Sequence, residues 1–324
     1  MIPTESKSGD LAQDRLPLVH AIVVTHAGAA WLPDCLRALA AQEARARLEI
    51  VVVDNGSSDG TSPLLRTEFP SVAVVRLAEN QGYARGNNAA LRRALAAGAD
   101  FAALVNDDVE VEPSWLQALL DAAAAHPDAG LLCGTLLFRG EERVNSTGVV
   151  LDAFGRARDR DFGLPRAEVH REDGPVPGVT GGAALIRCAL LRRTGLFDPG
   201  YFAYYEDVDL SLRAARDGFI CWYAKGAIAR HRFGATVGSG SPRQRFLLGR
   251  GHLRTLALHQ PALRAVALVP LTAAYRVAVK IPLELLRGRP GLALAELRAA
   301  VSGTAAALLA LPVRLRKIPP GADP

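Results

Sequence analysis

Short runs of apolar, mostly β-branched residues recur along the first third of the chain, and helical patterns separate them. A strand that is apolar without alternation is typical of a parallel sheet covered by helices on both faces. The alternation of strand and helix favours an α/β fold with a mostly parallel central sheet. The predicted strands are 21–24, 49–54, 72–77 and 101–105, and the helical patterns cover 30–42, 84–98 and 113–126.

The pattern changes after this region. Residues 139–180 are rich in glycine, proline and charge, so short strands and loops are expected there. A strand and a helix follow and end at Gly195. A short amphipathic helix then begins at Glu206 and stops at Gly218, and a further strand covers 219–224.

Each of the first four predicted strands ends in polar residues. Ligands of open parallel α/β sheets bind beyond the carboxyl ends of the strands, so these side chains are expected to line one site. The fourth strand ends in two adjacent carboxylates, whose repulsion a bound divalent cation would relieve. The four strand ends are Thr25–His26, Asp54–Asn55–Gly56, Glu79–Asn80–Gln81–Gly82 and Asn106–Asp107–Asp108.

Two common nucleotide-binding signatures do not fit this chain. A dinucleotide fold would place G-x-G-x-x-G after the first strand, where this chain has "THAGAAWLP", and a P-loop is also absent. In the second strand's "VVVDNGSSDGT", Asp54 can accept hydrogen bonds from a base or a ribose, whereas Asp59 is interpreted as a turn residue that caps the next helix.

Composition narrows the class of protein. With 324 residues and 49% hydrophobic content, the chain can bury a large core, which excludes wholesale disorder. The four cysteines are scattered, with neither disulfide nor zinc spacing, so a reducing cytoplasm is expected. Residues 1–16 are polar and lack the apolar segment of a signal peptide, so they are expected to form a flexible leader.

The net charge of +5 hides an asymmetry along the chain. Lysine and arginine far outnumber acidic residues after His231, whereas the preceding part is mildly acidic. A basic tail on an acidic body predicts a local anionic partner, such as a lipid surface, and not a nucleic acid.

The C-terminal region, 237–324, is expected to be helical, basic and amphipathic. Arg264, Arg276 and Lys280 interrupt its apolar run, and the uncharged stretch 299–313 is short for a membrane span. Such a region lies on a membrane more readily than it crosses one. Packing of these helices on the preceding domain or on a second subunit, as in a homodimer, is the alternative.

Six motifs, in this order, resemble family 2 glycosyltransferases of the GT-A fold. The resemblance is greatest to the bacterial rhamnosyltransferase-like branch that builds cell-surface polysaccharides. It covers about residues 18–236 and implies a GT-A domain over 17–236 that transfers a sugar from a nucleotide donor with inversion, using Mg²⁺ or Mn²⁺. The motifs are "VVTHAGAAWLPDCLRAL", "VVVDNGSSDGT", "NQGYARGNN", "VNDDV", "GGAALIR" and "YFAYYEDVDLSLR".

The resemblance implies roles for the donor side of the site. Asp108 and His231 match metal-binding positions of the family, and Asn106 stands where the family's D-x-D motif has its first aspartate, as a neutral partner of the ribose or of a metal-bound water. The other matched donor positions are Thr25 and Asp54 for base and ribose, Asn80, Gly82, Arg85 and Asn87 for the loop that closes over the nucleotide, Asp107 beside the metal motif, and Gly181 and Gly182 where backbone approaches the donor sugar.

An inverting transfer needs a base that takes the proton from the acceptor hydroxyl. Acidic residues at a helix N-terminus are common for dipole reasons alone, so composition does not choose a base among them. The match to the family's E-D motif implies Asp207 as the base, with Glu206 and Asp209 orienting the base or the acceptor. Arg213 is expected to pair with Asp209 at i,i+4 spacing.

These inferences predict an inverting, metal-dependent glycosyltransferase at the inner face of the cytoplasmic membrane. The resemblance implies rhamnose from dTDP-rhamnose as the first donor, with UDP-linked sugars next, and a lipid-linked saccharide as the acceptor. One alternative is a nucleotidyltransferase, which should have a phosphate loop rich in Gly, Arg and Lys after the first strand, unlike "THAGAAWLP". Another is a non-catalytic nucleotide-sugar binder, which Asn106 allows and Asp207 disfavours.

Overall fold

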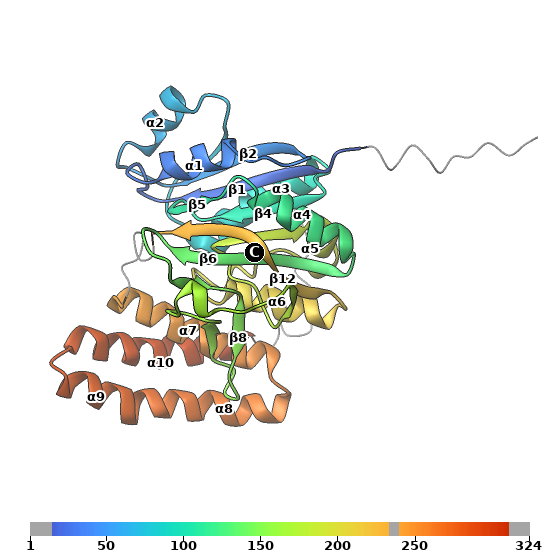
Figure 1. The fold of residues 1–324 in the computed structure, drawn as a ribbon. Helices are drawn as coiled ribbons and strands as arrows, with labels where there is room; N and C mark the ends of the chain where they lie inside the picture. Colours follow the sequence, from blue (N-terminus) through green and yellow to red (C-terminus); the bar gives the residue numbers. More distant parts are fainter. Residues whose placement is uncertain (1–14, 233–239, 311–324) are drawn as a thin grey trace, which may run out of the picture.

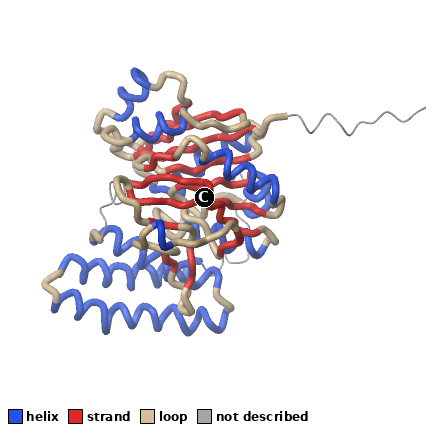
Figure 2. The backbone as a smooth tube through the Cα atoms, viewed as in Figure 1, coloured by secondary structure: helices blue, strands red, loops and turns tan. Residues whose placement is uncertain are grey.

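A mixed sheet of ten strands forms the centre of the computed structural model, which describes residues 15–232 and 240–310 (Figures 1 and 2). Strands β1 to β4 pair in parallel, as do β6 and β12, whereas β11 runs antiparallel between β4 and β6. The α/β prediction is confirmed. The strand order is β10 (Gly174–Val176), β12 (Ile220–His231), β6 (Ala129–Phe138), β11 (Ala183–Arg187), β4 (Phe101–Val105), β1 (Leu18–Thr25), β2 (Arg47–Asn55) and β3 (Ala73–Leu77), with β5 (Val109–Val111) on β12 and β7 (Val144–Ser146) on β6.

Helices cover both faces of this sheet, which explains why its central strands are apolar throughout. Along β1, Val19, Ala21 and Val23 belong to one core cluster, and Leu18 and Ile22 belong to the other. The first cluster packs under α1 (Leu32–Ala40) and α4 (Trp115–Ala125), and the second packs under α3 (Gly82–Ala96), α5 (Cys188–Thr194) and α6 (Glu206–Arg216). The short helix α2 (Thr61–Glu68) follows β2.

The segment predicted to form short strands and loops contains short strands. β8 (Val149–Leu151) and β9 (Ala157–Asp159) form a separate antiparallel pair, and a single turn of 3-10 helix follows at Arg166–Glu168. The predicted stops after α5 and α6 are also confirmed, because the glycines that follow them, Gly195 and Gly218, have φ of 87° and 84°. That left-handed region favours glycine.

Helices α7 (Pro242–His259) and α10 (Pro290–Ala310) lie between the sheet and an outer helical layer (Figure 1). Leu253 and Leu256 of α7 share a hydrophobic cluster with Tyr201, Tyr205 and Ala307. The core therefore continues across the predicted domain boundary at residue 236. Helix α7 packs on the preceding domain, as the alternative interpretation of this region proposes. The outer layer consists of α8 (Ala262–Tyr275), a π-helical turn (Arg276–Lys280) and α9 (Ile281–Leu286).

Two helical stretches are long and apolar enough to cross a membrane by length and composition, which corrects the expectation that charges leave no such stretch. They are Ala262–Leu286, 25 residues, and Pro290–Ala310, 21 residues, whose 18-residue windows have mean hydropathies of 1.5 and 1.4. Arg276 and Lys280 interrupt the first in sequence, but both side chains pair with the buried Glu296 of α10. Core helices of soluble proteins pass the same test, so length and composition alone do not establish a span.

The predicted leader, 1–16, lies outside the described residues except for its last two positions. The end of the predicted C-terminal region, 311–324, and the stretch 233–239 also lie outside them.

Candidate active site

The carboxyl ends of β1, β2 and β4 meet at one edge of the sheet, as the sequence predicts. Thr25, the last residue of β1, donates a 2.6 Å hydrogen bond from Oγ1 to Oδ2 of Asp107, just beyond β4. Both residues are buried. The adjacent turn must stay small, because a Cβ on Gly28 would lie 2.2 Å from Thr25 Oγ1 and 2.6 Å from Asp107 Oδ2.

A cavity of about 290 Å³ opens at this edge and contains most of the predicted catalytic and metal-binding residues. We call it the acidic cavity, because carboxyl groups from the loop after β4, from the start of α6 and from β9 line it. The predicted residues among its lining are Asn106, Asp107, Asp108, Gly181, Gly182, Glu206, Asp207 and His231, and Tyr83, Asn145, Asp159 and Thr180 line it in addition.

His231 and Asp108 face each other within this cavity. Nε2 of His231 lies 3.2 Å from Oδ1 of Asp108, and Nδ1 lies 2.8 Å from Oδ1 of Asn145. An amide oxygen can only accept, so Nδ1 of His231 is assigned as the donor in this hydrogen bond. Nε2 then faces a carboxylate, and a cation could lie between these two groups.

These side chains could bind a divalent cation, but they supply only some of the ligands that the cation needs. Oδ1 of Asn106 is buried and has no hydrogen-bond partner among the described residues. Within 15–232 and 240–310, no group of three or more His, Cys, Asp or Glu side chains is arranged to hold a metal ion. Mg²⁺ in particular is usually bound through one or two carboxylates, with phosphate oxygens and water completing its shell. Asp108, His231 and Asn106 fit that pattern.

In the loop after β4, burial disfavours the charged form of the Asp107 carboxyl group. Burial and, to a smaller extent, the neighbouring charge of Asp108 raise the pKa of Asp107 to about 7, against the hydrogen bond from Thr25. Such shifts concentrate at functional sites.

Asp207 is held at the first turn of α6 by two backbone N–H groups. Gly181 N donates to its Oδ2 at 2.9 Å, and Val208 N donates to its Oδ1 at 2.8 Å. Gly181 is in turn fixed through its carbonyl, which accepts a 2.7 Å hydrogen bond from Tyr83 Oη. The carboxylate is therefore oriented without a charged partner.

Glu206, beside Asp207, is in a different environment. Its side chain is buried, and Oε2 has no hydrogen-bond partner among the described residues. Burial raises the pKa of Glu206 well above its ordinary value, followed by the charge of Asp207. Burial also raises the pKa of Asp207, but its two N–H donors oppose the shift. The environments of the two carboxyl groups therefore differ, as in sites that pair a base with an acid.

The chain enters α6 through a strained turn. Tyr204 and Tyr205 have φ of 68° and 73°, values that residues other than glycine rarely adopt. Such strain persists only where surrounding packing fixes the conformation, and here it sets the direction in which Glu206 and Asp207 leave the turn.

Asp209 lies outside the lining of the acidic cavity. Its side chain is buried and bonds to Arg213 Nε at 2.9 Å, as predicted, and to His259 Nε2 at 2.7 Å. Arg213 and His259 hold the pKa of Asp209 well below its ordinary value, against the opposing effect of burial. Asp209 therefore connects α6 to α7 and fixes the position of the helix that contains Asp207.

The remaining predicted donor residues bond to their own loops. Asp54 accepts a 2.9 Å hydrogen bond from Ser57 N and another from the hydroxyl of Ser62. Asn80 Oδ1 accepts from Gly82 N at 2.9 Å. Asn87 is buried and donates to Tyr83 O at 2.9 Å. These residues shape the edge of the site without lining the acidic cavity.

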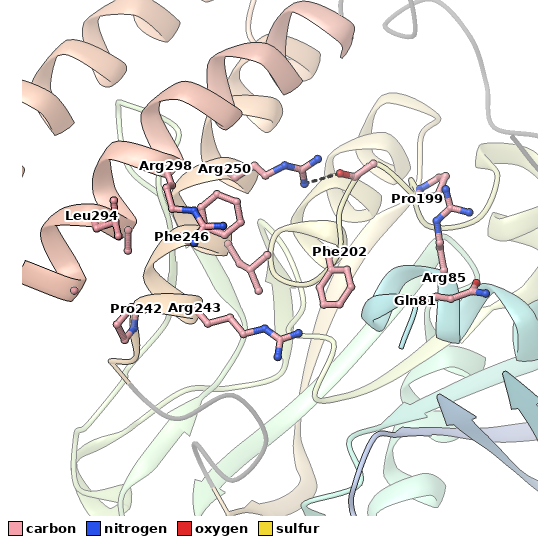
Figure 3. Close-up of a pocket in the computed structure, with 14 residues that line it drawn as sticks. Gln81, Arg85, Pro199, Phe202, Pro242, Arg243, Phe246, Arg250, Leu294 and Arg298 are labelled. Atoms are coloured by element: carbon pink, nitrogen blue, oxygen red, sulfur yellow. Dashed lines mark hydrogen bonds between the residues drawn. The ribbon is translucent and has the colours of Figure 1, made fainter. Parts of the chain in front are cut away.

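Arg85 is separated from the acidic cavity. It is exposed and lines a second cavity, between the sheet domain and the C-terminal helices (Figure 3). The structure thus does not bring this guanidinium to the carboxylates.

Sequence reasoning missed three residues that shape the site, and it named Asn55 only as part of the end of the second strand. Asn55 joins the ends of β2 and β3, because its Oδ1 accepts from Gln81 N at 2.9 Å. Asp159 is half-buried and lines the cavity, and desolvation raises its pKa to about 6. Asp159 and Asn145 both come from the segment where periodicity fails, so only their polarity marked them. Tyr83 lies within one of the six motifs. Its hydrogen bond to Gly181 joins residues far apart in the chain, so the sequence could not predict it.

Comparison with known proteins is consistent with this geometry. The family described as glycosyl transferase family 2 matches residues 20–195. An N-acetylglucosaminyl-diphospho-decaprenol L-rhamnosyltransferase of Mycobacterium tuberculosis is 28% identical over 245 residues, which cover 69% of this chain and 78% of that protein. An N-acetylglucosaminyltransferase of Azorhizobium caulinodans is 27% identical over 239 residues, which cover 68% of this chain and 57% of that protein.

Two solved structures confirm the predicted GT-A-like fold. Mannosyltransferase PcManGT from Pyrobaculum calidifontis, solved with GDP-Man and Mn²⁺, has a TM-score of 0.56 at 18% identity and covers 90% of this chain and 88% of its own. GalNAc-T7, solved with UDP, GalNAc and Mn²⁺, has a TM-score of 0.59 at 15% identity over 76% of this chain. This chain spans about half of GalNAc-T7, 48%.

Glu206→Gln is expected to flatten the pH dependence of stability. Because burial raises the pKa of Glu206, the folded state retains a proton that the unfolded chain releases. The free energy of unfolding is therefore highest below the unfolded pKa and falls as pH rises toward the folded pKa. Glutamine does not ionise, so the variant should lose less stability than the wild type between about pH 5 and about pH 8, as measured by urea unfolding.

Glu43→Gln provides the control, because Glu43 is exposed beyond α1. It should follow the wild-type pH dependence. Parallel curves for Glu206→Gln and the wild type would show that Glu206 is not protonated in the folded state.

Proposed function

The chain belongs to glycosyl transferase family 2, and we propose that it transfers a sugar, with rhamnose from dTDP-rhamnose as the first candidate, to a lipid-linked saccharide. The observation that supports this most directly is the acidic cavity, where an oriented carboxylate, Asp207, shares one space with Asp108 and His231. The donor and acceptor classes are supported by the name of the Mycobacterium tuberculosis relative at 28% identity.

Asp207 acts as the general base. Its two backbone donors orient the carboxylate, and the neutral Glu206 beside it avoids a second buried charge. The acceptor hydroxyl loses its proton to Asp207 while its oxygen bonds to the anomeric carbon. The bond from that carbon to the nucleotide diphosphate breaks in the same displacement, and its electron pair leaves with the diphosphate, so the configuration inverts.

The donor diphosphate approaches the loop after β4. Asp108, His231 and Asn106 would hold a Mg²⁺ or Mn²⁺, which supplies positive charge that neutralises the leaving diphosphate. Asp107 is bound to Thr25 and positions this loop. Asp54, Asn80, Gly82 and Asn87 shape the nucleotide side of the edge, and Gly181 and Gly182 let backbone approach the donor sugar.

A peripheral position at the inner face of the cell membrane completes the proposal. The outer helical layer exposes a row of large apolar side chains, and only 11% of the window within Ala262–Leu286 is buried. Apolar residues exposed together mark a surface that contacts lipid or protein. A lipid-linked acceptor has to be reached at a membrane, so lipid fits this layer. Its exposed apolar residues are Leu263, Val266, Leu271, Val277, Val279, Leu283, Leu285 and Leu286.

Nucleotide binding tests the donor site. In a thermal-shift panel of UDP, dTDP, GDP, CDP and NAD with and without Mn²⁺, we expect UDP or dTDP to raise the melting temperature only with metal, because a ligand of the folded state stabilises it by mass action. Asp108→Ala should remove this metal-dependent shift, whereas Asp121→Ala, on the exposed side of α4, should keep it. Stabilisation by NAD alone, or by no nucleotide, would contradict the proposed donor site.

Asp207→Asn tests the base. The rate of sugar transfer should fall by about 10²–10⁴-fold, the usual contribution of a general base. Metal-dependent nucleotide binding should persist, because Asp207 does not hold the metal in this proposal. Asp159→Asn is the comparison, since Asp159 also lines the cavity and also has a raised pKa, and its loss should be smaller. A larger loss in Asp159→Asn would move the base to β9.

Vesicle binding tests the membrane position. A cut at residue 240 would remove α7 and open the core, so point substitutions are preferable. Leu263→Gln combined with Leu286→Gln should reduce co-sedimentation with phosphatidylglycerol vesicles, because these side chains are 89% and 86% exposed. A control with Val74→Gln and Leu164→Gln changes exposed apolar residues of the sheet domain and should bind as the wild type does. Equal binding by both variants would refute the membrane role of α8 and α9.

A further inference from the structure

A second and larger cavity, of about 850 Å³, lies where α7 and α10 meet the loop 199–202 and the start of α3 (Figure 3). We call it the arginine cavity. None of the functions proposed above uses it. Its lining residues are Gln81, Arg85, Pro199, Gly200, Phe202, Pro242, Arg243, Phe246, Leu247, Arg250, Gly291, Leu294, Ala295 and Arg298.

The charged side chains of the arginine cavity have one sign. Arg85, Arg243, Arg250 and Arg298 line it, and no Asp or Glu is part of its lining. None of the four forms an ion pair with a carboxylate of the described residues, whereas the neighbouring Arg254 pairs with Asp198. Arginine binds phosphate groups through several N–H donors at once, so four unpaired guanidiniums around one space favour a ligand with more than one phosphate.

Arg250 is the most confined of the four. Its Nη1 donates to Gly200 O at 2.9 Å, shown as the dashed line in Figure 3. Burial lowers the pKa of Arg250, followed by the positive charge of Arg254. A guanidinium that is held in place in this way and lines the cavity without a carboxylate partner among the described residues favours an anionic ligand.

Apart from Gln81, the rest of the lining consists of apolar residues and glycines. The guanidinium carbon of Arg243 lies 5.5 Å from the centre of the Phe202 ring, and that of Arg298 lies 5.4 Å from the centre of the Phe246 ring. These rings keep the arginines extended at the cavity wall. Leu294 of α10 is 55% exposed and belongs to the same wall. The cavity therefore combines an anion-binding part with surface for a hydrocarbon chain.

The arginine cavity and the acidic cavity share two walls. Along α7, Arg243 and Leu247 line the former, and Gln244 and Leu248 line the latter. In the segment before α6, Phe202 faces the former, and Ala203–Tyr205 line the latter. The two spaces thus lie on opposite sides of the same short stretch of chain.

The loop at the start of α3, which is predicted to close over the nucleotide, also contacts this shared wall. Tyr83 N donates to Phe202 O at 2.6 Å, and a Cβ on Gly82 would lie 2.3 Å from the same oxygen. Only glycine permits this close approach, which fixes the start of α3, and with it Arg85, against Phe202.

We propose that the arginine cavity binds a lipid diphosphate, with the arginines on the diphosphate and the Phe202, Phe246 and Leu294 side chains on the first carbons of the chain. This proposal rests on the proposed function, because it assigns the lipid-diphosphate end of the acceptor to this cavity. The saccharide attached to that diphosphate then extends past the shared wall toward Asp207. The lipid chain continues along α10, which exposes Leu294, Leu297 and Val301.

Geranyl diphosphate, a water-soluble isoprenoid diphosphate, is the probe. Its binding to the full chain is measured by titration calorimetry in a buffer with EDTA, so that no metal can bring the diphosphate to the acidic cavity. Arg243→Ala combined with Arg298→Ala should weaken binding on the order of tenfold or more, since each charged hydrogen bond is worth more than a neutral one. Both side chains are exposed and lack ion pairs among the described residues, so the fold should tolerate the change.

Arg264→Ala combined with Arg289→Ala is the matched control. It removes the same charge from exposed positions of the C-terminal helices outside the cavity, and it should bind as the wild type does. Equal weakening in both double variants would reduce the effect to net charge and overturn the proposal, as would a wild type that does not bind the probe.

Three further ligands identify the chemistry. Geraniol and inorganic diphosphate should each bind more weakly than geranyl diphosphate, because each offers only half of the complementary surface. If inorganic diphosphate binds as tightly as the probe, the ligand of the cavity is a free phosphate compound and not a lipid. A short-chain phosphatidylglycerol that binds more tightly would replace it by a phospholipid headgroup.

Two active-site variants separate this proposal from the proposed function. Asp108→Ala and Asp207→Asn should bind geranyl diphosphate as the wild type does, even though they lose metal-dependent nucleotide binding and transfer, respectively. A protein that binds nucleotides with metal and transfers sugar, but does not bind the probe, would overturn only the arginine cavity. A loss of probe binding in Asp108→Ala would place the probe in the acidic cavity and would also overturn it.

Discussion

The burial of several carboxyl groups in one small cavity is the constraint on which the rest of this structure depends. Asp107, Asp159, Glu206 and Asp207 all have raised pKa values, because burial penalises their charged forms. The sheet edge fixes the first, and the strained turn before α6 fixes the last two. Two backbone N–H groups stabilise the charge on Asp207, whereas Oε2 of Glu206 has no hydrogen-bond partner among the described residues. The charged forms of these groups are therefore costly in the cavity, and stability elsewhere has to offset the cost of assembling them.

Helix α7 supplies part of that stability and makes the C-terminal region part of the catalytic unit. Its Arg254 forms a buried ion pair with Asp198, with Nη2 at 2.6 Å from Oδ2, and Thr255 lies 2.8 Å from Tyr201 Oη. His259 at its end reaches Asp209 on α6. These three contacts surround the segment 198–209, which contains the strained turn and the base. Removing one partner of a buried ion pair leaves an unpaired buried charge, so the segment is fixed as long as α7 is in place.

The sequence predicted the parts of the site that depend on local pattern. The strands around Thr25, Asp54 and Asp107 were identifiable because buried parallel strands are continuously apolar and end in polar residues at one edge. Asp159 was not identifiable, because its segment has no periodicity and its place in the cavity comes from long-range packing. The length of the apolar helices was underestimated for a related reason. Arg276 and Lys280 read as surface charges, whereas both point inward to Glu296 on another helix.

The two cavities differ in the charge that lines them, and this difference can sort two substrates that both contain a diphosphate. The acidic cavity repels a diphosphate unless a divalent cation lies between them, so it suits a ligand that arrives with metal. The arginine cavity needs no cation and would be a poor place for a metal-bound diphosphate, whose charge is already neutralised. A wall of α7 and the residues before α6 separates the two, so each diphosphate is held on its own side while the groups attached to them meet at Asp207. Discrimination between donor and acceptor then follows from charge and does not require recognition of either sugar.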